Sequence, residues 1–184
     1  MAAGKGLGGV VLASGVLCAA VIFGALRWER TVALPMNDGT VVNGVHHYTI
    51  DEFNYYYVPA HLTWHVGEQV QLTVMDRSQS APPLPHQFSI GRDLVTRNNG
   101  FPHSQALAVG WKTNFFDGVA ITAGGQTQPI PAFSVSLNPG QKFTFSFTVP
   151  NKPGEWHYAC FLQTGQHYMN GMHGRINVLP AQGA

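Results

Sequence analysis

Residues 156–174, with the sequence WHYACFLQTGQHYMNGMHG, combine three side chains that bind soft metals within one short segment. The three follow one another in the order C-x6-H-x4-M, as Cys160, His167 and Met172. Residues 156–160 are rich in aromatic side chains, and residues 175–179 (RINVL) alternate polar and apolar side chains. Both patterns are typical of strands. The sequence therefore predicts a strand, a loop that carries all three side chains, and a second strand.

The chemistry of these side chains indicates copper. A thiolate, an imidazole and a thioether are soft to intermediate ligands, and together they favour copper over calcium, magnesium or manganese. A trigonal copper site of this type needs one more histidine, with the methionine as a weak axial ligand. The best candidate is His86, in residues 84–90 (LPHQFSI), where alternation places His86, Phe88 and Ile90 on one face of a short strand.

The composition limits the classes of function. With 184 residues the chain fits one domain of ordinary size and an extension. Charged residues make up 10%, against about 25% in typical globular proteins. The formal net charge is +1, so the chain lacks the basic surface of nucleic-acid-binding proteins, and no nucleic-acid partner is expected. The two cysteines, Cys18 and Cys160, occur in very different contexts, which excludes a disulfide scaffold.

The N-terminal segment is long and apolar enough for a membrane helix. Residues 7–26 (LGGVVLASGVLCAAVIFGAL) contain no charged side chain, and a helix of this length spans about 30 Å. A cleaved signal peptide is the alternative interpretation, but the apolar run is longer than a usual signal core and no small-x-small cleavage site follows it. We predict a flank at 1–6, an uncleaved transmembrane anchor at 7–27 and a linker at 28–44.

The rest of the chain has the texture of an all-β domain. Turns divide it into short strand-like segments, at 53–58, 62–66, 69–75, 86–90, 133–137 and 142–149. This spacing predicts an antiparallel β-sandwich at 45–179, followed by a tail at 180–184. Residues 92–131 are read as an irregular insertion. Two interpretations of the insertion stay open: short strands at 106–109 and 119–122, or a lid beside the metal.

Three segments carry a family resemblance. Residues 66–72 (VGEQVQL), 85–88 (PHQF) and 158–174 resemble the cupredoxin, or type 1 copper protein, family. The ligand loop is similar to that of pseudoazurins, and the preceding W-x-Y-x-C is similar to that of nitrite reductases, sulfocyanin and rusticyanin. The resemblance covers roughly residues 44–179. It implies a Greek-key β-sandwich of the cupredoxin type after the N-terminal helix.

The resemblance also implies a ligand set and a function class. His86, Cys160 and His167 would bind one copper ion (Cu(I)/Cu(II)) in the equatorial plane, and Met172 would be axial. Four protein ligands leave no open position for a small-molecule substrate, which favours an electron carrier over an enzyme.

One departure from the family leaves the exact ligand set open. Six residues separate Cys160 from His167, more than in most small blue copper proteins, so the optical character (blue, green or red) is also left open. Met169 and His173 are alternative ligands, and Gln163 is a further candidate neighbour of the metal. Thr164 stands where a di-copper site would need its second cysteine, so that site is not expected.

The remaining histidines and aromatic residues have simpler interpretations. His157 differs from Cys160 by an odd number along a strand, so it should face the other way. Phe161, Tyr168 and Met169 are read either as an apolar docking rim around His167 or as core. Five histidines are expected not to bind metal: His46, His47, His61, His65 and His103.

Anchor, cupredoxin-like domain and low charge together resemble the membrane-anchored cupredoxins associated with cytochrome c oxidase in acidophilic iron oxidisers. This implies a single-pass protein of the inner membrane with its β domain in the periplasm. It would carry single electrons in a respiratory chain, between a c-type cytochrome and a terminal cytochrome oxidase. The alternatives are a copper enzyme, or a copper-delivery or oxidase accessory protein, with an open or labile copper site.

Overall fold

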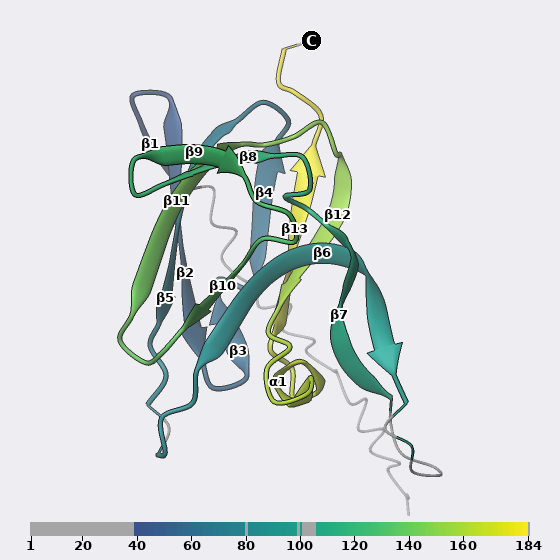
Figure 1. Ribbon diagram of the computed structural model, residues 1–184. Helices are drawn as coiled ribbons and strands as arrows, with labels where there is room; N and C mark the ends of the chain where they lie inside the picture. The colour runs from purple at the N-terminus through teal and green to yellow at the C-terminus, as the bar shows by residue number, and fades with distance from the viewer. Residues whose placement is uncertain (1–38, 80, 99, 101–105, 184) are drawn as a thin grey trace, which may run out of the picture. The chain divides into compact units, whose positions relative to one another are not determined.

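A computed structural model describes residues 39–79, 81–98, 100 and 106–183 (Figure 1). In this part of the chain the regular structure is all β except for one four-residue helix, α1 (Gln166–Met169). No helix among the described residues is long and apolar enough to cross a membrane. The predicted anchor at 7–27 and its flank lie outside the described residues.

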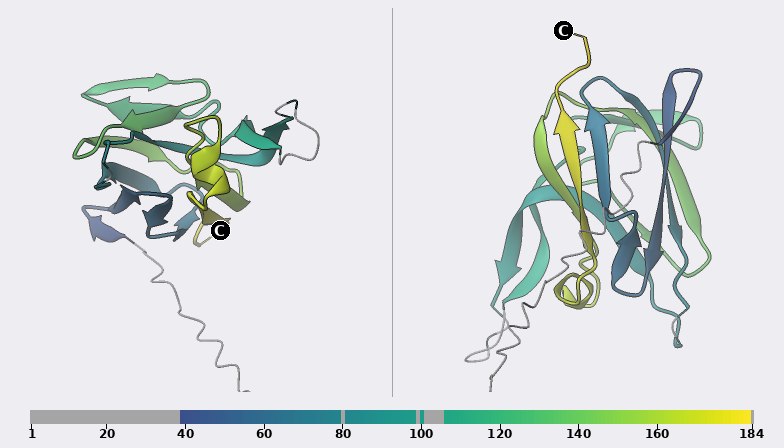
Figure 2. Two further views of the ribbon diagram at one scale, coloured as in Figure 1. Left: turned by 90° about the horizontal axis from the view of Figure 1, so that it is seen from below. Right: turned by 180° about the vertical axis from the view of Figure 1, so that it is seen from behind.

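The strands form two sheets (Figures 1 and 2). The first sheet has the order β1 (Thr40–Val42), β2 (Val45–Phe53), β5 (Gln69–Asp76), β11 (Lys142–Thr148), β8 (Ala120–Ala123) and β9 (Gln126–Pro129), with β3 (Tyr56–Val58) also paired to β2. The second has the order β10 (Ser134–Leu137), β6 (His86–Arg97), β12 (Gly154–Ala159), β13 (His173–Leu179) and β4 (His61–His65), with β7 (Leu107–Asn114) also paired to β6. The pairs β2–β5 and β13–β4 are parallel, and the other pairs are antiparallel.

The two sheets pack against each other through aromatic side chains. Trp64 of β4 contacts Phe147 of β11, with ring centroids 5.3 Å apart, and Tyr57 of β3 contacts Tyr158 of β12 at 5.1 Å. All four side chains are buried, and each contributes roughly 1.5–3 kcal/mol or more through removal of apolar area from water. The prediction of an all-β domain built from two sheets is confirmed.

Two strand assignments near the start of the domain differ from expectation. Residues 53–58 are not one strand, because a turn at Asn54 and Tyr55, the latter with φ 67°, separates β2 from β3. The β-rich composition hid this turn, which contains no glycine. The sheet also begins inside the stretch read as linker, where a turn at Asn43 and Gly44 joins β1 to β2.

The insertion at 92–131 is more regular than predicted. β6 continues to Arg97 and pairs with β7, and β8 pairs with β9 as a second hairpin. The strands expected at 106–109 and 119–122 lie at Leu107–Asn114 and Ala120–Ala123. Figure 1 shows β6 as a long curved strand whose far part leaves the sheet together with β7.

Candidate metal centre

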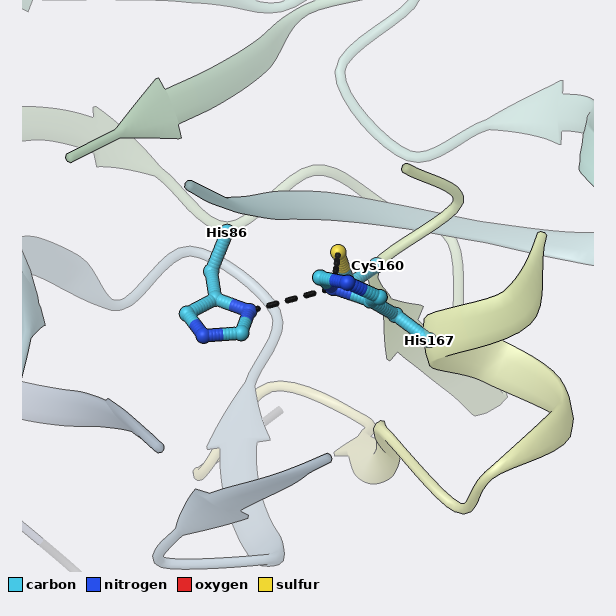
Figure 3. Close-up of side chains that lie close together, drawn as sticks. All are labelled: His86, Cys160 and His167. Carbon is cyan, nitrogen blue, oxygen red and sulfur yellow. Dashed lines mark hydrogen bonds between the residues drawn. The ribbon is translucent and has the colours of Figure 1, made fainter. Parts of the chain in front are cut away.

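Three of the four predicted ligands lie together (Figure 3). His86 opens β6, Cys160 directly follows β12, and His167 lies in α1. The Nδ1 atom of His167 is 3.2 Å from Cys160 Sγ and 3.2 Å from His86 Nδ1. One ligand atom from each residue falls within 4.8 Å of the others, and all three side chains are fully buried.

Strand pairing brings these residues to one place. Ala159, at the end of β12, is the cross-strand partner both of Ser89 in β6 and of His173 in β13. The loop between β12 and β13 is then closed by backbone hydrogen bonds: Cys160 N–H donates to Met172 O at 3.2 Å, and Met172 N–H donates to His167 O at 3.0 Å. The folded loop therefore places the His167 side chain next to the Cys160 side chain.

Gln87, next to His86 in β6, forms hydrogen bonds to the start of the loop that carries Cys160 and His167. Sequence reasoning missed this role. Its backbone N–H donates to Cys160 Sγ at 3.3 Å, and its side-chain Oε1 accepts from the Phe161 N–H at 3.2 Å. An N–H directed at a ligating sulfur orients it and stabilises its thiolate form. The only signal in the sequence is the position of Gln87 next to His86.

Burial disfavours charge on all three side chains. It raises the pKa of the Cys160 thiol to about 11. Burial lowers the pKa of His86, partly opposed by the Asp76 carboxylate, and burial followed by repulsion from His86 lowers the pKa of His167. Without metal the site therefore holds a neutral thiol and neutral imidazoles at neutral pH, and a metal ion that binds must displace the thiol proton.

The donor set fits one copper ion. A sulfur and two imidazole nitrogens converge in a buried site, which is the combination that copper of the blue type uses. The Nε2 atoms of His86 and His167 are buried and have no hydrogen-bond partner among the described residues, while their Nδ1 atoms face the convergence point. His86, Cys160 and His167 thus form a group that could hold a single copper ion.

The fourth predicted ligand and its rivals occupy different environments. Met172 is fully buried, and its backbone is bonded to both loop ligands, but its role as axial ligand stays a prediction. Met169 is 40% exposed, and Gln163 and His173 are also exposed. The three alternatives therefore lie at the surface.

Tyr55 covers His167. The two rings meet edge to face with centroids 5.4 Å apart and an interplanar angle of 88°. The imidazole is 0% exposed, whereas Tyr55 is 38% exposed. His167 is therefore not itself at the surface, and sequence reasoning missed its cover, which comes from the β2–β3 turn.

The three residues read as rim or core differ in exposure: Phe161 and Tyr168 are half-buried, and Met169 is exposed. Phe161 and Tyr168 stack on each other at 5.6 Å, and Trp111 of β7 meets Phe161 edge to face at 5.0 Å. The β6–β7 hairpin thus packs beside the ligand loop. The insertion therefore contains the expected strands, and a role as a lid stays a prediction.

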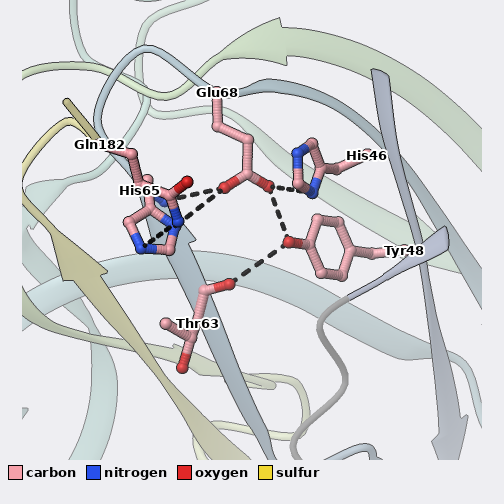
Figure 4. A network of polar contacts seen from close by, with 6 residues as sticks. All are labelled: His46, Tyr48, Thr63, His65, Glu68 and Gln182. Carbon is pink, nitrogen blue, oxygen red and sulfur yellow. Dashed lines mark hydrogen bonds and ion pairs between the residues drawn. The ribbon is translucent and has the colours of Figure 1, made fainter. Parts of the chain in front are cut away.

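Other histidines stand apart from this group. His157 pairs with Glu155 at 3.2 Å and stacks on Trp111, away from Cys160 as expected. His46 and His65 flank the buried carboxylate of Glu68, at 3.2 Å and 3.6 Å (Figure 4). Neither His47 nor His61 belongs to the group, and His103 lies outside the described residues.

Comparisons with known proteins find similarity to solved structures but no similarity in sequence to a protein family or a curated protein. No protein-family model matches the chain, and no curated protein matches it in sequence. Among solved structures it is similar to dithionite-reduced auracyanin from the photosynthetic bacterium Roseiflexus castenholzii, at 17% identity and a TM-score of 0.46 over 73% of this chain and 97% of that one. It is similar to auracyanin B at 15% identity and a TM-score of 0.46 over 79% and 96%.

Proposed function

We propose that this protein is a cupredoxin-type electron carrier that binds one copper ion through His86, Cys160 and His167, with Met172 as axial ligand. The observation that carries the proposal is the convergence of one sulfur and two imidazole nitrogens, all fully buried, from separate elements of a two-sheet β domain. A closed site of this kind suits electron transfer, because a catalytic metal site needs a position open to substrate.

The partner proposal rests on Tyr55, which covers His167, and on two exposed apolar side chains that are near Tyr55 or His167 in the sequence. Tyr55, Tyr56 and Met169 are 38%, 51% and 40% exposed, and Tyr55 contacts the imidazole directly. Exposed apolar side chains beside a buried metal ligand fit a redox partner that docks transiently. We infer that electrons pass through Tyr55 and His167, between a c-type cytochrome and a terminal cytochrome oxidase. The apolar segment at 7–27 would hold the carrier on the periplasmic side of the inner membrane.

The first test is optical and EPR spectroscopy of the full chain in detergent, loaded with Cu(II). We expect an intense visible thiolate-to-copper band that is insensitive to azide and is lost in Cys160→Ala. His167→Ala should alter the band, and the matched control His173→Ala should keep it. A colourless protein would favour copper delivery, and a band reshaped by azide would favour a copper enzyme with an open site.

The partner and the anchor are tested separately. Stopped-flow mixing of the oxidised carrier with a reduced c-type cytochrome should show rapid electron transfer that slows in Tyr56→Ala. Cell fractionation should find the full chain in the inner membrane and a chain lacking residues 1–30 in the periplasmic extract when it is given a cleavable export signal. Failure of either result would remove that part of the proposal and leave the copper site intact.

A further inference from the structure

Two acidic side chains are buried side by side in the first sheet. Glu52 of β2 and Asp76 of β5 are cross-strand partners in the parallel pair, and both are 0% exposed. Cross-strand partners point to the same face of a sheet, so the two carboxyl groups lie next to each other. The pair replaces apolar residues at the end of a strand whose other inward residues, Val70, Leu72 and Val74, belong to the core.

The pair has little compensation from hydrogen bonds. Asp76 Oδ1 accepts from the Ser78 N–H at 2.8 Å. Asp76 Oδ2 and both carboxyl oxygens of Glu52 have no hydrogen-bond partner among the described residues. Burial of a polar group without a partner costs several kcal/mol, and burial of a lone charge costs more. One of the two carboxyl groups is therefore expected to stay protonated at pH values well above those at which a carboxyl group ordinarily loses its proton. Glu52 is that group, because burial followed by repulsion from Asp76 raises its pKa to about 8.

A chain of contacts connects this pair to the metal centre. Glu52 is also the cross-strand partner of Tyr57 in β3, on the side opposite Asp76. The Tyr57 hydroxyl donates to the backbone carbonyl of Gln87, whose N–H donates to Cys160 Sγ. A charge on the carboxyl pair also acts on the candidate copper ligands. Burial is the main cause of the raised pKa of Cys160, and the Glu52 and Asp76 carboxylates raise it further. Burial lowers the pKa of His86, and the Asp76 carboxylate opposes this fall.

We propose that Glu52, held against Asp76, is a proton-binding site coupled to the copper: it takes up one proton when the copper is reduced and releases it on oxidation. The inference rests on the proposed function, since it requires a copper ion that changes charge. The step balances as Cu(II) plus one electron from the reductant, with one proton from solvent and the Glu52 carboxylate, giving Cu(I) and the Glu52 carboxylic acid.

The sign follows from the charge of the site. Cu(I) with a thiolate carries no net charge, like the neutral thiol of the metal-free protein, so the pKa of Glu52 in the reduced protein should stay close to about 8. Cu(II) with a thiolate carries one positive charge more, which stabilises the carboxylate and lowers the pKa of Glu52. At pH values between the pKa of Glu52 in the oxidised protein and its pKa in the reduced protein, reduction is accompanied by proton uptake. The reduction potential therefore falls as pH rises through this range.

The other titratable and charged groups near Glu52 are not expected to bind the proton that is taken up on reduction. Tyr57 stays protonated, because burial and the carboxylate of Glu52 raise its pKa well above the ordinary value. Asp76 from β5 supplies the repulsion, and Cys160 and His86 are proposed copper ligands. Arg77 pairs with Asp51 at 2.7 Å, and its contact with Glu52 is a backbone N–H donated to the Glu52 carbonyl.

The test is a spectroelectrochemical titration of the copper-loaded full chain from about pH 5 to about pH 9, the range over which such a carboxyl group titrates. In the unsubstituted protein the potential should be flat in acid and fall over a window that ends near pH 8, by at most 59 mV per pH unit, the one-electron equivalent of a tenfold change. Glu52→Gln should abolish the slope. Asp76→Asn should move the window to lower pH, because it removes the repulsion that raises the pKa of Glu52.

Glu68→Gln is the matched control. Glu68 is also a buried carboxylate, with its side chain 4% exposed, but it precedes β5 at the opposite end, about 26 Å along the strand from Asp76 at about 3.3 Å per residue. The reduction potential of Glu68→Gln should change with pH by the same slope as that of the unsubstituted protein. A second readout is the reduced-minus-oxidised infrared spectrum, which should gain a protonated carboxyl band at neutral pH that is missing in Glu52→Gln.

The outcomes separate the two proposals. Absence of a thiolate–copper band or of a one-electron wave would overturn the proposed function. A normal band with a pH-independent potential, or with the same slope in Glu52→Gln, would overturn the proton site alone. If Glu52→Gln does not fold, an unchanged window in Asp76→Asn would likewise overturn the proton site.

Discussion

Gly165 of the ligand loop lies so close to Ala108 of β7 that a Cβ atom on Gly165 would be 1.9 Å from the Ala108 carbonyl oxygen. The backbone of Gly165 also has φ +81°, a conformation that other residues adopt at a cost of about 1–2 kcal/mol. The ligand loop thus rests directly on the β6–β7 hairpin. An insertion that shows no function in the sequence supports the segment that carries His167.

Gly165→Ala should therefore destabilise the protein and disturb the copper site. We expect a loss of about 2–5 kcal/mol in the free energy of unfolding, from the strained φ and the displacement of backbone. Gly118→Ala is the control, because Gly118 has φ +78° but nothing within 4 Å of the added Cβ. Denaturant unfolding and the visible spectrum measure both effects. Equal losses in the two variants would contradict the contact with β7.

Removal of the Tyr55 ring should open the copper site to small anions. The edge-to-face contact with His167 contributes about 0.5–1.5 kcal/mol, so the protein should remain folded. We expect azide to change the visible spectrum of copper-loaded Tyr55→Ala and to leave the unsubstituted protein unchanged. Tyr56→Ala, which removes a ring stacked on Phe53 at 4.9 Å, should resemble the unsubstituted protein. An azide-insensitive Tyr55→Ala would show that another group closes the site.

Glu52 should make the metal-free protein lose stability as pH rises. Its pKa is raised from 4.5 to about 8 in the folded protein, so between these values the folded state binds more protons than the unfolded state. The stabilisation is full below pH 4.5 and is lost as pH rises towards 8, by up to about 5 kcal/mol. Denaturant unfolding at several pH values should show this fall, and Glu52→Gln should remove it. A fall of equal size in Glu52→Gln would assign it to another group.

The Glu68 cluster should stabilise the opposite end of the sheets without affecting the copper. Glu68 accepts hydrogen bonds from the Tyr48 hydroxyl at 2.7 Å and from the His65 backbone N–H at 2.9 Å. We expect Glu68→Gln to cost about 1–3 kcal/mol in unfolding free energy, because these buried donors lose a charged acceptor. Glu155→Gln, at a carboxylate 54% exposed, should cost less than about 1 kcal/mol. A changed copper spectrum in Glu68→Gln would contradict the separation of the two sites.

Copper uptake should release one proton from Cys160. Burial raises the pKa of this thiol to about 11, so it is protonated over the ordinary pH range and its proton is lost when the metal binds. The apparent affinity for copper should fall about tenfold for each unit of acidification in the range where both imidazoles are neutral. Competition with a chelator of known pH dependence measures the slope. An affinity independent of pH would mean that the metal-free site already holds a thiolate.

Local patterns in the sequence predicted most of the strands and the three candidate ligands of the loop, and the need for a second histidine together with the family resemblance added His86. Alternation of polar and apolar residues marked most of the strands, because one face of each is buried and the period of a strand is two. Cys160 and His167 come together for a local reason too, since one short loop between paired strands holds both. Met172 shares this loop, and its role depends on the same local spacing.

The tertiary structure alone decided what faces these residues. His86 meets His167 across 81 positions of the chain, and Tyr55 covers the same imidazole from a turn in the other sheet. Glu52 and Asp76 become neighbours only through the register of a parallel strand pair. Contacts of this kind depend on how strands are ordered and aligned in the sheets, which local periodicity does not report because it reflects only which face of each strand is buried.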